Sequence, residues 1–396
     1  MNDQLPSISS VSASSTQSHA PVFFVFLEIF EREGGIQSYV KDIFQSYLTL
    51  TDAPSAEIFL LRDGHNCSNA FESSPLTFHY FKSRSATMGR LYMAMSLFRS
   101  LLWKRPQRVF CGHIKLASLI ELLCRPLGIP YTVLTYGKEV WEPLPKRDRQ
   151  ALARANQIWT ISRYTRDRAC SANQLNPQKI ALLPCAVDGE QFTPGQKSPE
   201  LLHKYGLAHS RVLMTVARLW SGDIYKGVDI TIRALPTIVD AHPDVKYLVI
   251  GRGDDQPRLA KLANDLGMGD RVIFAGFVAT EHLPDHYRLA DAYIMPSQEG
   301  FGIVYLEAMA CGVPVLSGDA DGSSDPLQDG TLGWQVPHRD PSAVARACIN
   351  LLNGDDQRCD GVWLREQALA LFGKEAFAKQ LQTLIASSSY SGMRLS

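Results

Sequence analysis

Short apolar runs alternate with longer amphipathic stretches along most of the chain, and this alternation predicts strands followed by helices. In the first half, the runs that we interpret as strands cover residues 21–30, 56–61, 108–111, 131–134, 158–161 and 180–184. In the second half, comparable runs cover residues 211–217, 246–251, 271–275, 292–295 and 313–316. Runs that are apolar at nearly every position are typical of parallel strands covered by helices on both faces. The pattern therefore predicts an α/β fold built on parallel sheets.

The stretches between these runs repeat their apolar residues at helical spacing. Predicted helices cover residues 39–50, 116–124, 228–239, 281–289, 303–310, 342–352 and 374–386. A further long segment, 84–108, mixes apolar side chains with basic ones, which are Arg84, Arg90, Arg99, Lys104, Arg105 and Arg108. A cationic amphipathic helix of this kind can lie on an anionic membrane surface, and an ordinary helix with a solvated face is the alternative.

The length of 396 residues exceeds what one ordinary hydrophobic core covers, so we expect two domains. We predict a first domain at 21–187, a linker at 188–208, a second domain at 209–370, and a final helix with its tail at 371–396. The serine-rich segment 1–20 lacks a basic start and an apolar run. We expect it to be disordered, and to be neither a secretory signal nor an anchor.

The composition narrows the choice of partners and compartment. Forty basic and forty acidic residues cancel, which gives no charge signal for nucleic acid. The eight cysteines form no Cys-x-x-Cys pair, so we expect reduced thiols in the cytoplasm and no zinc site. No apolar run approaches the roughly 20 residues that a membrane-spanning helix needs.

The stretch EGFGIVYLEAMACGVPV, from Glu299 to Val315, places two glutamates eight positions apart around a glycine-containing turn and a short helix. Free N–H groups at a helix start, together with the positive end of the helix dipole, suit a phosphate group. Glu299 precedes the helix and Glu307 lies on its second turn. We therefore expect both carboxylates to reach one ligand lying across the helix start, with two ordinary solvated acids as the alternative.

Two basic residues are predicted to lie near the same helix start. Arg218 follows the strand 211–217, and Lys226 ends the next loop, so both lie above the carboxyl ends of parallel strands. Two fixed cations and a helix N-terminus can stabilise a departing diphosphate without a metal ion. The alternative is a surface pair in which Asp223 is the partner of Lys226.

The Glu299–Val315 stretch resembles the Glu-x7-Glu motif of family 4 of the retaining nucleotide-sugar glycosyltransferases. These enzymes have the GT-B architecture, in which two Rossmann-like, doubly wound domains face each other across a cleft. The likeness covers nearly the whole chain and is strongest from residue 212 to residue 333. It implies that Arg218 and Lys226 hold the donor diphosphate, that Glu299 holds donor-sugar hydroxyls, and that Glu307 holds the ribose hydroxyls. The other implied donor contacts are Gly34, Gly35, Gly251, Phe277, Val278, Phe301, Gly302, Ile303 and Val304.

One position departs from the family pattern. Relatives carry a histidine close to the donor sugar and the reacting bond, and Tyr136 stands at that position. A phenol, whose ordinary pKa is near 10, is a poor base at neutral pH. Retaining transfer does not require a protein base when the leaving phosphate helps the incoming hydroxyl. His113 is a candidate substitute for the sugar contact, although a lone histidine is more often structural. The catalytic candidates are Glu299, Arg218, Lys226, Tyr136 and His113.

Asp319 and Asp321 form an Asp-x-Asp pattern, which resembles the metal site of the other, metal-dependent transferase architecture (GT-A). Because they lie in a polar loop after the strand 313–316, we interpret them as turn residues. We predict no metal and no cofactor.

The sequence and the resemblance together predict a cytoplasmic retaining glycosyltransferase. It would move a sugar from a nucleotide sugar to a saccharide or lipid-linked acceptor in polysaccharide or glycoconjugate biosynthesis. Many relatives use lipid-linked acceptors, which implies peripheral contact with the inner face of the membrane. The alternatives are a non-catalytic sugar-nucleotide-binding subunit, suggested by Tyr136, and a sugar-nucleotide epimerase on the same architecture.

Overall fold

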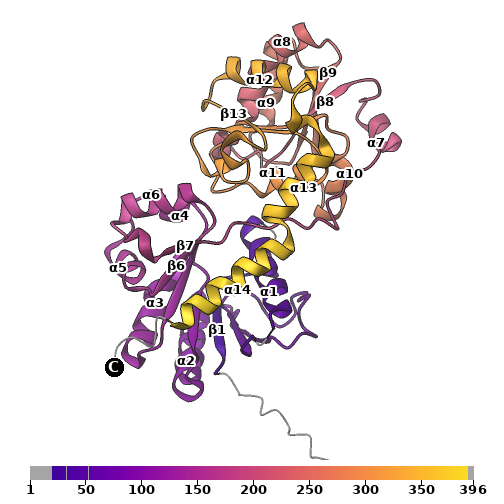
Figure 1. The fold of residues 1–396 in the computed structure, drawn as a ribbon. Helices are drawn as coiled ribbons and strands as arrows, with labels where there is room; N and C mark the ends of the chain where they lie inside the picture. Colours follow the sequence, from indigo (N-terminus) through magenta and orange to yellow (C-terminus); the bar gives the residue numbers. More distant parts are fainter. Residues whose placement is uncertain (1–19, 33, 52, 391–396) are drawn as a thin grey trace, which may run out of the picture.

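A computed structural model describes residues 20–390 except residues 33 and 52, and it shows two α/β domains joined by a long C-terminal helix (Figure 1). Nearly all of the predicted disordered tail, residues 1–19, lies outside the described residues. Across the described residues, no helix combines the length and the apolar character needed to cross a membrane.

The first domain is built on a sheet of seven parallel strands in the order β3-β2-β1-β4-β5-β6-β7. The strand order reverses between β1 and β4, as in doubly wound folds. The strands are β1 (Val22–Phe26), β2 (Ala56–Leu60), β3 (Thr77–Tyr80), β4 (Arg108–Cys111), β5 (Tyr131–Thr135), β6 (Gln157–Thr160) and β7 (Ile180–Leu182).

The second domain repeats this plan with six parallel strands in the order β10-β9-β8-β11-β12-β13. Its order reverses between β8 and β11. Its strands are β8 (Arg211–Val216), β9 (Val245–Ile250), β10 (Val272–Gly276), β11 (Ala292–Met295), β12 (Val315–Gly318) and β13 (Trp334–Val336). The predicted two-domain, doubly wound α/β fold is confirmed.

Helices follow most strands and cover both faces of each sheet (Figure 1). Those of the first domain are α1 (Gly35–Thr49), α2 (Ala86–Lys104), α3 (Ile114–Cys124), α4 (Lys138–Trp141), α5 (Lys146–Arg154) and α6 (Arg163–Asn173). Those that follow are α7 (Pro199–Lys204), α8 (Val228–Ala241), α9 (Gln256–Asp265), α10 (Leu283–Tyr287), α11 (Ile303–Ala310), α12 (Pro341–Asn353), α13 (Gly361–Phe372) and α14 (Lys374–Tyr390).

The last helix, α14, runs back from the second domain along α1 of the first (Figure 1). The rings of Tyr39 and Phe377 meet edge to face with their centroids 5.9 Å apart. The Lys374 ammonium pairs with the Asp188 carboxylate, and the Gln380 side chain donates a hydrogen bond to the Leu182 carbonyl at 2.8 Å. The chain therefore leaves the second domain and ends packed on the first.

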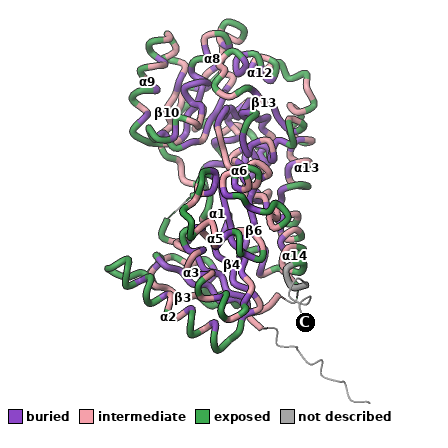
Figure 2. Tube along the Cα trace, turned by 90° about the vertical axis from the view of Figure 1, so that its left-hand side faces the viewer, coloured by how far each residue is buried: buried purple, intermediate pink, exposed green. Residues whose placement is uncertain are grey.

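The burial of β1 explains why the strand runs are apolar throughout. All five residues of this strand are buried, as are those of the neighbouring strand β4 (Figure 2). The side chains of β1 alternate between two cores. Phe24 and Phe26 pack on the face that continues towards α14 and the second domain, whereas Phe23 and Val25 pack on the opposite face with α2 and α3. A strand covered on both faces cannot show the polar alternation of a half-exposed strand.

Several element boundaries differ from the predictions for local physical reasons. The predicted strand 21–30 ends at Phe26, because the next residues form a loop, and the helix predicted from residue 39 already begins at Gly35. The strand predicted at 313–316 begins at Val315, because the N–H of Val313 still bonds to the Ala308 carbonyl of the preceding helix. The edge strands β3 and β13 and the helices α4, α5, α7, α9 and α13 were not predicted.

Candidate active site

The candidate residues of both domains lie at the carboxyl ends of parallel strands, which is where doubly wound folds bind ligands. Gly34 follows β1 and Tyr136 follows β5 in the first domain, whereas Arg218 follows β8 and Glu299 follows β11 in the second. The loops from the two domains touch. A Cβ atom added at Gly300 would lie 2.5 Å from the Tyr136 carbonyl oxygen, so only glycine fits there.

Helix α11 begins at Ile303, as predicted, and its N-terminus is available for a ligand. Among the described residues, no side chain caps this end, and its first turn carries no acidic residue. Gly302 precedes the helix with φ 93°, and a Cβ atom there would lie 2.5 Å from the Tyr305 ring. Glycine is therefore required at the turn. The free N–H groups at this helix start suit an anionic ligand.

The main chain of Glu299 is held on both sides by the loop after β12. Its N–H donates to the Asp321 carboxylate at 2.5 Å, and its carbonyl accepts from the Gly322 N–H at 2.9 Å. Asp321 also accepts from the Ser323 N–H at 2.8 Å, the turn chemistry expected for this residue. Burial raises the pKa of Asp321 to about 7 against the effect of these hydrogen bonds. Asp321 thus positions Glu299, a role that the sequence did not indicate because the two residues are far apart in the chain.

Glu307 lies on the second turn of α11 and is almost completely buried, with 9% of its surface exposed. The Tyr287 hydroxyl donates to one of its carboxylate oxygens at 2.6 Å. Burial raises the pKa of Glu307 to about 7, although this hydrogen bond opposes the shift. No other hydrogen bond to this carboxylate is found in the described part of the chain, which leaves its second oxygen for a ligand.

The two predicted diphosphate cations each pair with an acid of the same domain. Arg218 lies 2.8 Å from the Asp223 carboxylate, and the Lys226 ammonium pairs with the Glu299 carboxylate. Asp223 is therefore the partner of Arg218. The alternative considered from the sequence, in which Asp223 pairs with Lys226, is wrong. Lys226 and Glu299 are both largely buried, with 18% and 15% of their side chains exposed, so solvent screens this pair weakly.

The glycine loop of the first domain is held by an acid that the sequence analysis missed. Gly34 and Gly35 lie exposed at the start of α1. The loop before them is fixed by the fully buried Asp63, whose carboxylate accepts from the N–H groups of Ile29 at 2.6 Å and Glu31 at 2.9 Å. Because these partners lie more than 30 positions away, no local pattern marks Asp63.

The Tyr136 hydroxyl is turned into the protein, where it donates to the Gly112 carbonyl at 2.8 Å. The residue is 7% exposed, and its ring meets the Tyr39 ring edge to face at 5.8 Å. Burial raises the pKa of Tyr136 well above its ordinary value of 10.0. In this conformation, Tyr136 supports the strand ends and its hydroxyl does not face the cleft.

His113 follows β4, immediately after the glycine that Tyr136 contacts. Its Nδ1 accepts from the Lys115 N–H at 3.1 Å, so in the neutral ring Nε2 carries the proton. Burial, with smaller contributions from Lys115 and Arg62, lowers the pKa of His113 to about 4. At neutral pH the ring is therefore uncharged and can donate a hydrogen bond.

Two of the implied donor contacts, Gly251 and Phe277, lie directly after β9 and β10. Gly251 has φ 136°, and a Cβ atom there would lie 1.8 Å from the Ala217 carbonyl oxygen, so no other residue fits. The Phe277 ring is 55% exposed, and the Arg252 guanidinium lies 4.7 Å from its centroid. This pair offers a planar surface at the edge of the strand ends.

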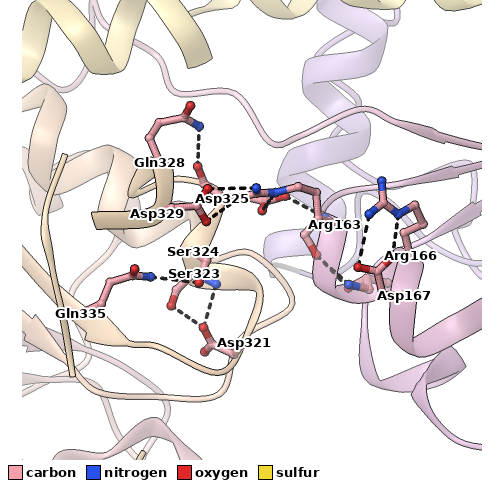
Figure 3. A network of polar contacts seen from close by, with 12 residues as sticks. Arg163, Arg166, Asp167, Asp321, Ser323, Ser324, Asp325, Gln328, Asp329 and Gln335 are labelled. Atoms are coloured by element: carbon pink, nitrogen blue, oxygen red, sulfur yellow. Dashed lines mark hydrogen bonds and ion pairs between the residues drawn. The ribbon is translucent and has the colours of Figure 1, made fainter. Parts of the chain in front are cut away.

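An ion-pair network links the two domains beside these loops (Figure 3). Arg163, at the start of α6, donates to the Asp325 carboxylate at 2.6 Å and to the Asp329 carboxylate at 2.7 Å. Its main-chain N–H also donates to Asp325 at 2.7 Å. Ser162 caps α6 by accepting from the Thr165 N–H. The network therefore joins a helix start of the first domain to the loop after β12 that also positions Glu299.

Comparison with known proteins identifies this arrangement. The profile of the family described as Glycosyl transferases group 1 matches residues 210–354. A GDP-mannose-dependent α-(1-6)-phosphatidylinositol monomannoside mannosyltransferase from Mycolicibacterium smegmatis is 36% identical over 262 residues, which are 62% of this chain and 67% of the relative. A monoacylated-substrate counterpart from Corynebacterium glutamicum is 28% identical over 342 residues, which are 83% of this chain and 87% of the relative.

A solved structure agrees in fold. The Anabaena protein Alr3699/HepE, solved in complex with UDP, superposes with a TM-score of 0.76 at 19% identity, covering 92% of this chain and 99% of that one. At this level of identity, the similarity shows only that the two proteins share the same fold. Together with the sequence relatives, it shows that the chain belongs to the group 1 family of glycosyl transferases and is a nucleotide-sugar glycosyltransferase of GT-B architecture.

Proposed function

We propose that the enzyme transfers a mannosyl group from GDP-mannose to a lipid-linked acceptor, with retention of anomeric configuration and without a metal ion. The mannosyltransferases from M. smegmatis and C. glutamicum support this choice of donor, because both are described as GDP-mannose-dependent. Both act on phosphatidylinositol mannosides, which supports a glycolipid acceptor.

The observation that carries this proposal is the placement of two cations beside an uncapped helix start. Arg218 and Lys226 lie in the loop after β8, and α11 begins close to Glu299, the partner of Lys226. Cleavage of a glycosyl–phosphate bond leaves negative charge on the diphosphate. Fixed cations and helix N–H groups that are already in position stabilise such charge most effectively.

The proposed reaction needs no base from the protein. The bond between C1 of the sugar and the β-phosphate oxygen breaks, and the acceptor oxygen bonds to C1 on the same face. The acceptor proton passes to an oxygen of the departing phosphate. This route is compatible with His113, which is neutral, and with Tyr136, whose hydroxyl is buried.

The remaining roles are proposed from the resemblance of the Glu299–Val315 stretch to the Glu-x7-Glu motif and from the places of these residues at the strand ends. Glu299 would hold donor-sugar hydroxyls once the diphosphate replaces it as the partner of Lys226. The second oxygen of Glu307 would accept from a ribose hydroxyl. The other proposed donor contacts are Gly34, Gly35, Gly251, Phe277, Val278, Phe301, Gly302, Ile303 and Val304.

The test is transfer by the purified enzyme from GDP-mannose to a phosphatidylinositol mannoside, with UDP-glucose, UDP-galactose and ADP-glucose as competing donors. NMR of the product reports the anomeric configuration. We expect an α-linked mannoside from GDP-mannose. Binding of GDP-mannose with neither transfer nor slow hydrolysis would favour the non-catalytic subunit. Release of an altered sugar nucleotide in the absence of acceptor would favour the epimerase.

We also propose that α2 holds the enzyme at a membrane surface. Its inner side is buried through Met93, Leu97 and Leu101. Its outer side is also apolar, with exposed residues that are Met88, Leu91, Tyr92, Met95, Phe98, Leu102 and Trp103. Figure 2 shows this exposed helix projecting from the first domain. An apolar outer face flanked by basic residues, which are Arg84, Arg90, Arg99, Lys104 and Arg105, suits an anionic lipid surface better than water.

A further inference from the structure

Lys138 is the first residue of α4 and lies where the loops of the two domains touch. Its ammonium lies 3.1 Å from the centroid of the Tyr225 ring, which belongs to the second domain. The Lys226 ammonium lies 5.4 Å from the same centroid. One aromatic ring therefore has a lysine from each domain close to it, beside the proposed diphosphate site.

The charges in this cluster do not balance. Arg218 is paired with Asp223, and Lys226 is paired with Glu299. Within the described residues, no carboxylate lies within ion-pair distance of Lys138. Partial burial lowers the pKa of Lys138, an effect that Asp223 and Glu299 oppose, while Lys226 and Arg218 add to it. The cluster thus holds one cation more than its acids neutralise, and that cation comes from the first domain.

We propose that Lys138 is a donor-binding residue that adds a third cation, contributed by the first domain, to the diphosphate site. This assignment rests on the proposed function. The face of an aromatic ring attracts an ammonium group far less strongly than a phosphate does. Tyr225 therefore holds Lys138 only until a diphosphate arrives, and the lysine then moves to the phosphate oxygens.

The position of Lys138 also connects donor binding to the contact between the domains. Lys226 and Arg218 belong to the second domain, and Lys138 belongs to the first. A diphosphate bound by all three would draw the first domain's loop onto the second domain. Exclusion of water from the closed site strengthens each of these interactions.

The test measures the affinity for GDP and GMP by calorimetry in the full-length wild type and in Lys138→Met. We expect GDP to bind about tenfold more weakly to the variant, the usual effect of losing a charged hydrogen bond. The affinity for GMP should fall less than the affinity for GDP, because GMP carries one phosphate fewer. Lys138→Arg should restore most of the GDP affinity. Lys146→Met, which removes an exposed lysine of α5, is the matched control and should bind as wild type does.

Two outcomes would overturn the role of Lys138. One is GDP binding by Lys138→Met within about twofold of wild type, and the other is an equal loss for GDP and GMP, which a purely structural contact with Tyr225 would cause. Neither outcome touches the proposed function. That proposal fails separately if the wild type does not bind GDP.

Discussion

The two sides of the site are built in different ways. The second domain brings its charges already paired, Arg218 with Asp223 and Lys226 with Glu299, on short loops beside the start of α11. The first domain brings mostly neutral groups, such as the glycine loop and His113, together with Lys138, which lies over the Tyr225 ring and has no carboxylate partner among the described residues. Under the proposed function, this difference would mean that the diphosphate side is organised before the donor arrives, whereas the other side completes the site afterwards.

Preorganisation is the more useful arrangement on the side where charge develops. A cation held in place by a neighbouring acid does not need to be reoriented when the leaving group departs. The acceptor side carries no comparable developing charge. Its main chain is fixed instead by hydrogen bonds to distant residues, such as Asp63 and Tyr136.

The largest expected effect comes from breaking the paired side. Lys226→Ala and Glu299→Ala should each lower kcat/KM for transfer by about a thousandfold, because each loses an interaction with the reacting diphosphate or sugar. Thermal unfolding should show that both variants remain folded. Near-normal turnover in both variants would refute the assignment of the site to the second domain.

A second large effect is expected at the outer face of the first domain. Leu91→Glu combined with Met95→Glu should weaken binding to vesicles containing phosphatidylglycerol by about a hundredfold, through lost burial of two apolar side chains. Leu371→Glu, at an exposed leucine of α13, is the matched control. Two results would argue against a membrane surface. One is that the double variant binds vesicles as well as wild type does. The other is that sedimentation shows a wild-type dimer that the double variant has lost.

A moderate effect should separate the two candidates near the donor sugar. His113→Ala should lower kcat/KM about tenfold by removing a hydrogen-bond donor, whereas Tyr136→Phe should cost about 1 kcal/mol of stability and little activity. Steady-state kinetics and thermal unfolding measure both quantities. A larger loss of activity in Tyr136→Phe than in His113→Ala would indicate that Tyr136, and not His113, contacts the donor sugar.

The smallest effect concerns the buried acid of the second domain. Burial raises the pKa of Glu307 from its ordinary 4.5 to about 7, so between these values the folded protein holds a proton that the unfolded chain releases. This contribution to stability is present below pH 4.5 and is lost as the pH rises to 7. As the pH rises from acidic to neutral, the melting temperature of Glu307→Gln should therefore fall less than that of the wild type. The pKa of Asp321 is raised in the same direction, but Asp321 is present in both proteins. If melting temperature changed with pH equally in wild type and Glu307→Gln, this account would be contradicted.

The sequence predicted the fold because its signals are local, and the proposed second-domain site rests on signals of the same kind. The helix from Ile303 to Ala310 and its two glutamates lie within one short stretch, and the strands are continuous apolar runs. The edge strand β3 was missed for the opposite reason, since Thr77–Tyr80 is short and only partly buried.

The supporting contacts could not be predicted in the same way. Asp63 reaches Ile29 across 34 positions, Asp321 reaches Glu299 across 22, and Arg163 reaches Asp325 across 162. No periodicity or motif marks such pairs, because they form only when strands and domains come together. The inward direction of the Tyr136 hydroxyl is a further case, since it depends on the carbonyl of Gly112, which directly follows the neighbouring strand β4.

The most direct test of the central claim is the initial rate of transfer from GDP-mannose in the presence of EDTA. The account predicts that chelation leaves the wild-type rate within about twofold, and that Mn²⁺ or Mg²⁺ does not rescue Lys226→Ala, because Arg218 and Lys226 take the place of a metal ion. Loss of wild-type transfer in EDTA, recovered on adding either ion, would contradict it.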